Sequence, residues 1–165
     1  MHIELRACPP RAARELSPRL YDPDEDDVRS IVMDVCDVLD WSAEFLIAGF
    51  GQARWPVDVR TDLAVFLEQL PDAVQALRAR ERAVIDLYEQ GIERTLEFVP
   101  QGDRCAVRCV SRTDWAPDPA VEEMEIKALE DMLLAVRTEF LNALGQLAPS
   151  LAAHPWIVEW RQVMD

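Results

Sequence analysis

The chain has 165 residues, half of them apolar or aromatic, and a formal net charge of −14. This length predicts one domain with a hydrophobic core, and the apolar content excludes wholesale disorder. The negative charge argues against nucleic acid and anionic membrane surfaces as partners and favours basic proteins.

Membrane and targeting signals are absent from the sequence pattern. No stretch approaches the roughly 20 apolar residues of a membrane-spanning helix. Residues 1–14 mix charged residues and prolines and lack the apolar core of a signal peptide. We therefore expect a cytoplasmic protein.

Residues 1–27 are predicted to be an acidic, proline-rich arm, and residues 28–165 a single α+β domain. Four prolines interrupt the arm, and an acidic run over residues 22–27 closes it. A short helix fits residues 11–16.

Residues 28–41 carry a pattern that suits two structures. Apolar residues at three-and-four spacing favour a helix, which Asp22 and Glu25 could cap. The density of β-branched residues favours a strand instead. The apolar run over residues 45–50 reads as a strand that needs a neighbour, so we predict a pair of strands here.

Residues 58–80 predict a helix with one continuous apolar face, begun by Asp58 or Thr61. Pro71 is expected to kink this helix or divide it in two. A three-strand meander is predicted to follow over residues 82–112, with tight turns at Gly91 and Gly102. One face of its second and third strands is predicted to carry Ile92, Arg94, Leu96, Phe98, Cys105, Val107 and Cys109.

The C-terminal part is predicted to be helical. The longest helix spans residues 118–148, with Pro119 in its first turn. Three glutamates would offset the positive end of its dipole: Glu122, Glu123 and Glu125. A last short helix follows His154. Together these elements predict an α+β fold, with a small antiparallel sheet of about five strands covered on one face by the helices of residues 58–80, 118–148 and 154–163.

The residues that could carry catalysis or hold a cofactor form no recognisable set. Only two histidines occur, and neither a nucleophile elbow nor a glycine-rich phosphate loop is present. Cys105 and Cys109 lie four residues apart on a predicted strand, which separates them by ~13 Å. That distance prevents a disulfide and a shared metal. We predict no catalytic residues, no cofactor and no metal.

The candidate binding residues are acids of the segment 22–72, which holds 13 acidic residues against three arginines. Carboxylates that interrupt apolar segments are costly to bury, so we expect them at the surface. The predicted partner-binding residues are Asp34, Asp37, Asp40, Glu44, Trp55, Asp58 and Asp62. A simpler interpretation is that these acids only form a solvated face of the protein. A site for a hard cation such as Ca²⁺ is not indicated, because the spacing of the acids matches no EF-hand.

A small, acidic α+β chain that presents Asp and Trp in loops and lacks a catalytic set resembles the immunity proteins of bacterial toxin–immunity systems. The resemblance implies a non-enzymatic inhibitor that neutralises a basic toxin or effector by complementary charge. Two alternatives stay open. One is a small carboxylate-based enzyme, which a pocket joining Asp and Glu with Tyr88 or an arginine would favour. The other is a structural or oligomerising subunit, which an exposed apolar helix face would favour. The oligomeric state stays open as well.

Overall fold

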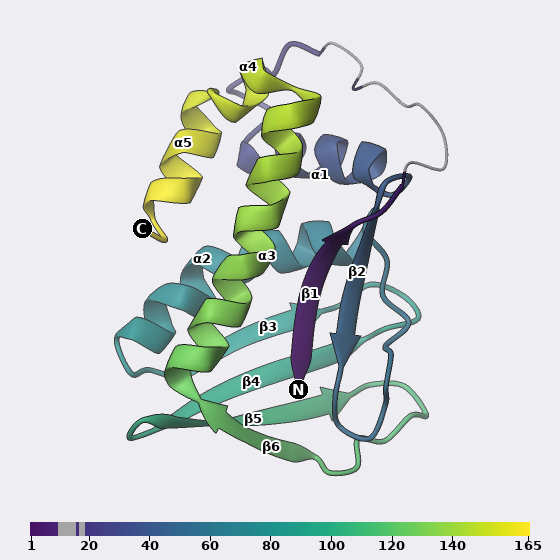
Figure 1. Cartoon of the computed structure of the whole chain (residues 1–165), viewed down its shortest axis with the longest axis vertical. Helices are drawn as coiled ribbons and strands as arrows, with labels where there is room; N and C mark the ends of the chain where they lie inside the picture. The colour runs from purple at the N-terminus through teal and green to yellow at the C-terminus, as the bar shows by residue number, and fades with distance from the viewer. Residues whose placement is uncertain (10–15, 17–18) are drawn as a thin grey trace.

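The computed structural model of the chain describes residues 1–9, 16 and 19–165. Within these ranges the chain forms six strands and five helices, so the predicted α+β class is confirmed (Figure 1). In chain order the elements are β1 (His2–Ala7), α1 (Val28–Leu39), β2 (Ala43–Ala48), α2 (Asp62–Arg78), β3 (Ala83–Leu87), β4 (Arg94–Gln101), β5 (Arg104–Ser111), β6 (Val121–Glu125), α3 (Ile126–Leu147), α4 (Pro149–Ala152) and α5 (Pro155–Gln162).

The strands form two antiparallel sheets rather than one. β1 pairs with β2, and the other four strands follow one another in the order β3-β4-β5-β6. The predicted three-strand meander is confirmed and gains β6 as a fourth strand. Figure 1 shows β1 and β2 standing beside the long helix α3, while the four-stranded sheet lies across one end of them.

The first helix corrects a sequence prediction, because residues 28–39 form α1 and not a strand. The periodicity of the apolar residues decides the structure here: six of them share one buried face, namely Ile31, Val32, Val35, Cys36, Val38 and Leu39. Asp27, and not Asp22, caps the helix, since its side chain accepts the N–H of Arg29 at 2.8 Å. β-branched residues are tolerated because packing outweighs their modest helix penalty.

The neighbour that β2 needs is supplied by β1, so the prediction of an arm is corrected for residues 2–7. Ile3 lies opposite Ile47, and Leu5 lies opposite Phe45. These four side chains are buried. Residues 11–15 of the predicted short helix lie outside the described part of the chain.

The long helix begins later than the sequence predicted, at Ile126 instead of residue 118. Residues 121–125 form β6, in which Glu122 lies opposite Val107 and Met124 lies opposite Cys105. The N–H of Ile126 donates to the carbonyl of Asp103 at 2.9 Å, which joins the start of α3 to the β4–β5 turn. Glu122 and Glu123 therefore belong to a strand and do not offset the dipole of α3.

The core is shared by both sheets and the helices that pack on them. α2 continues through Pro71 without division, and it packs against β3 and α3. α3 packs against β1 as well, and α5 contacts α1. The predicted inner face of the meander is confirmed, because Arg94, Leu96, Phe98 and the two cysteines of β5 are buried. No helix among the described residues is long and apolar enough to cross a membrane.

Candidate functional site

The exposed side of α1 carries acids between two large apolar side chains. Because one helix face packs into the core, the residues at three-and-four spacing on the other side face solvent. Met33 is 61 % exposed, and Trp41, just after the helix, is 36 % exposed. We call this surface the acidic stripe; it consists of Met33, Asp34, Asp37, Asp40 and Trp41.

The loop before α2 lies beside the acidic stripe. Arg60 of this loop forms an ion pair with Asp37, with Nε 2.9 Å from Oδ1. Asp58, which is exposed, accepts the N–H of Thr61 at 2.7 Å and its hydroxyl at 2.9 Å. Its charge also contributes to raising the pKa of Cys36 in α1, after the larger effect of burial. The sequence suggested Asp58 or Thr61 at the start of α2: Thr61 is the N-cap residue but makes no side-chain cap bond, and Asp58 supplies the carboxylate that holds it. Asp58 also adds a carboxylate next to the stripe.

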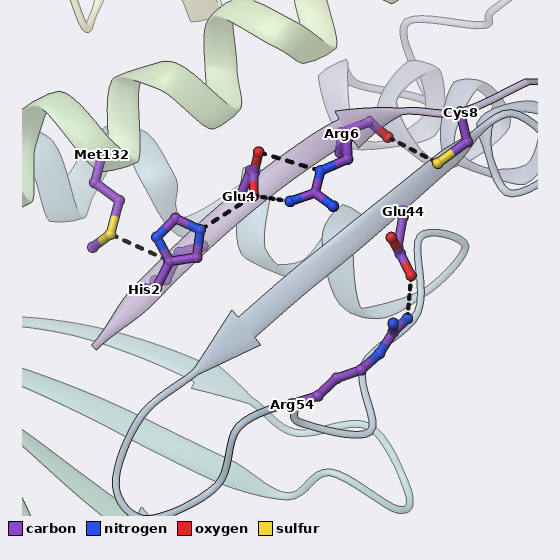
Figure 2. A network of polar contacts seen from close by, with 8 residues as sticks. His2, Glu4, Arg6, Cys8, Glu44, Arg54 and Met132 are labelled. Atoms are coloured by element: carbon purple, nitrogen blue, oxygen red, sulfur yellow. Dashed lines mark hydrogen bonds and ion pairs between the residues drawn. The ribbon is translucent and has the colours of Figure 1, made fainter.

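Glu44 lies on the outer face of the two-stranded sheet (Figure 2). Its carboxylate pairs with Arg54 at 2.5 Å. On the neighbouring strand, Glu4 accepts from Arg6 at 2.8 Å and contacts the ring of His2 at 3.2 Å. The charged side chains of this outer face pair with one another, and Glu44 belongs to β2 and not to α1, so it is not part of the acidic stripe.

Two of the predicted binding residues, Trp55 and Asp62, are buried, and the expectation that Asp62 is exposed is wrong. Trp55 is 1 % exposed, and its indole N–H donates to the carbonyl of Gly49 at 3.2 Å. Asp62 is 4 % exposed and accepts the N–H of Asp58 at 2.9 Å. Its other carboxylate oxygen has no partner among the described residues. Burial, with the charges of Asp58 and Glu89, raises the pKa of Asp62 to about 6.

Arg94 has no carboxylate partner among the described residues, although it is 3 % exposed. Its guanidinium lies 3.5 Å from the ring centre of Trp115 and 4.6 Å from that of Trp55. Nη1 donates to the side chain of Gln52 at 2.7 Å, and burial lowers the pKa of Arg94. Cation–π contacts with two indoles offset part of the cost of burying this charge. The sequence predicted Arg94 on an apolar strand face, but no residue pattern indicated its contacts with Trp55 and Trp115.

Two of the three carboxylates in the acidic stripe pair with arginines from nearby loops. Asp34 pairs with Arg19 at 3.3 Å, and Asp37 pairs with Arg60. Asp40 forms no ion pair within the described residues. Met33 and Trp41 were not predicted as binding residues, because their exposure becomes evident only once residues 28–39 are known to be helical.

The described residues include no group of three or more His, Cys, Asp or Glu side chains arranged to hold a metal ion. An open cavity of about 470 Å³ lies at the start of α3 and brings acids and bases together. It is lined by Arg80, Asp103, Arg104, Glu125, Ile126 and Lys127. A second cavity, about 260 Å³ and mostly apolar, lies between the ends of β1, β2 and α3.

No protein-family model, no curated protein and no solved structure matches the chain.

Proposed function

We propose that this chain is a non-enzymatic protein-binding domain that inhibits a basic toxin or effector, in the manner of an immunity protein. The acidic stripe is its contact surface, extended by Asp58. The segment 22–72 retains a large excess of negative charge, because its 13 acids face three arginines of the same segment. A surface of this sign attracts a basic partner and raises the rate of encounter.

The observation that carries this proposal is the exposure of Met33 and Trp41 at the two ends of a row of carboxylates. Methionine and tryptophan are enriched in protein–protein interfaces, and tryptophan is frequent among the residues that dominate binding energy. Carboxylates alone would suit a solvated helix face. Large apolar groups at the two ends of the row provide the area that a stable complex buries.

The function is tested by affinity capture from the native host, with elution by increasing salt. We expect a basic protein that binds stoichiometrically at ~50 mM salt and is released as the Debye length falls to ~3 Å near 1 M. The purified pair should then form a complex in isolation. Capture of a partner with net negative charge, or a complex whose association rate is insensitive to salt, would contradict the proposal.

The alternative of a carboxylate-based enzyme has one observation in its favour, the cavity that contains Asp103 and Glu125 with three basic side chains. The side chain of Asp103 is fully exposed and pairs with Arg80 at 3.7 Å. A ligand pocket buries most of the surface of its ligand, and a fully hydrated side chain does not provide such an enclosure. Tyr88 lies outside this lining. A turnover screen that detects activity lost in Asp103→Asn would favour the enzyme instead.

A further inference from the structure

Arg19 occupies a small site formed by two carboxylates and an aromatic ring. Nη1 donates to Asp34 at 3.3 Å, and Nη2 donates to Asp26. The guanidinium carbon lies 5.0 Å from the ring centre of Tyr21. A planar guanidinium suits this arrangement, because it can bridge two carboxylates and stack on a ring at the same time.

The three residues around Arg19, namely Tyr21, Asp26 and Asp34, also make contacts that do not involve Arg19. The hydroxyl of Tyr21 donates to Asp34 at 3.0 Å, and its ring packs edge-on against His154 and Trp156. Burial and the bond to Asp34 raise the pKa of Tyr21 to about 12, so this hydroxyl remains a donor at neutral pH. Asp26 is only 9 % exposed, and it accepts the main-chain N–H of Asp22 at 3.0 Å.

The side chain of Arg19 is more exposed to solvent than that of Asp26. Its side chain is 45 % exposed, and the residue lies outside the helices and strands. Its pair with Asp34 joins side chains that are 45 % and 35 % exposed, so water and salt compete for both charges and this pair contributes little to stability. Another guanidinium of equal charge can replace Arg19 and keep the two carboxylates compensated.

We propose that Asp26, Asp34 and Tyr21 form an arginine-binding site that Arg19 fills in the free chain and that a guanidinium of the basic partner fills in the complex. The inference rests on the proposed function, since Asp34 belongs to the acidic stripe. It adds a chemical preference for arginine over lysine, because a compact ammonium cannot bridge the carboxylates and stack on Tyr21 in the same way. It also makes Arg19 a competitor of the partner.

The test measures binding of hexa-arginine and hexalysine by calorimetry at ~50 mM salt, where electrostatic screening is low, in a buffer without phosphate, which would compete for the guanidinium groups. Three full-length proteins are compared: wild type, Arg19→Ala and Arg82→Ala. Arg82 is a matched control, because it also lies outside helices and strands and pairs with one carboxylate, Glu97, at 2.7 Å. Both variants therefore carry the same net charge, and circular dichroism checks that both fold.

We expect Arg19→Ala to bind hexa-arginine about three- to fivefold more tightly than Arg82→Ala, the change expected when the ion pairs of Arg19 with Asp34 and Asp26 no longer compete for these carboxylates. Hexalysine should gain less, and adding Asp34→Asn to Arg19→Ala should remove the gain. Equal affinities for the two single variants, or an equal gain for hexalysine, would overturn the arginine site and leave the proposed function intact. If no protein binds hexa-arginine at this salt, the arginine site is wrong, while the capture experiment still decides the proposed function.

Discussion

Glu122 and Phe50 join the two sheets, because a carboxylate oxygen of Glu122 on β6 accepts the main-chain N–H of Phe50 at 2.5 Å in the turn after β2. The same carboxylate pairs with the ammonium group of Met1. Phe50 is fully buried and has a φ of 57°, a left-handed conformation that is unfavourable for a bulky residue. Its carbonyl also accepts the N–H of Asp118 at 3.0 Å. Both main-chain polar groups of Phe50 are therefore hydrogen-bonded to residues of the β5–β6 region.

The first prediction concerns this junction. Glu122→Gln should lower the free energy of unfolding by about 1–3 kcal/mol, because a charge-assisted hydrogen bond is weakened and the ammonium loses its counter-ion. Urea denaturation measures the change. Glu123→Gln is the matched control, since Glu123 faces the other side of β6 and is 59 % exposed. It should change stability by no more than about 0.5 kcal/mol. Equal losses in the two variants would show that Glu122 has no special role at the junction.

The second prediction concerns the buried carboxyl of Asp62, whose pKa rises from an ordinary 3.8 to about 6 in the folded chain. Between pH 4 and pH 6 the unfolded chain releases this proton first, so the folded chain binds more protons and its stability falls as pH rises. Relative to Asp62→Asn, wild type should lose up to about 3 kcal/mol across this window. Denaturation curves at several pH values measure it.

The control for Asp62 is Asp72→Asn, at an exposed position of the same helix. It should preserve the pH dependence of wild type. A wild-type profile parallel to that of Asp62→Asn between pH 4 and pH 7 would mean that the carboxyl is hydrated in solution.

The third prediction concerns the four cysteines, all of which are free thiols in the described structure. Cys36, Cys105 and Cys109 are buried, and burial raises the pKa of each thiol, to about 11 for Cys109. Because the thiolate is the reactive form, these three should react slowly. A chromogenic disulfide reagent should detect one fast thiol in the native protein and four in denaturant, and Cys8→Ser should remove the fast one. Two or more fast thiols in the native protein would contradict the burial described here.

Elements with strong local signals could be predicted from the sequence, and those that depend on distant partners could not. The meander and α2 have clear periodicity and turn residues. β1 and β6 are short strands rich in charged residues, and each is recognisable only through the strand it pairs with. Val28–Leu39 shows a different cause of error, because its β-branched residues suggested a strand while its spacing correctly favoured a helix.

The residues of the candidate site were predicted correctly where a local sequence pattern marks them, and wrongly where burial depends on distant partners. Asp34, Asp37 and Asp40 were chosen because they interrupt an apolar segment, and the helix places them on one side. Trp55 was chosen as a loop tryptophan, but it fills the core beside Arg94. Asp62 lies at the start of a helix whose first turn is buried, and this packing has no local sequence signal.

The acidic stripe is tested most directly as the partner surface by comparing how two triple variants bind the basic protein captured from the host. Asp34→Asn/Asp37→Asn/Asp40→Asn removes three charges from the acidic stripe. Asp103→Asn/Glu123→Gln/Asp131→Asn removes three exposed carboxylates elsewhere, each of which has a basic partner. Stopped-flow association rates are measured over a range of salt concentrations. We predict that the stripe variant associates about tenfold more slowly and with a flatter salt dependence, and that the control variant stays close to wild type. Equal losses in both variants, or no loss in either, would contradict the assignment of the acidic stripe as the partner surface.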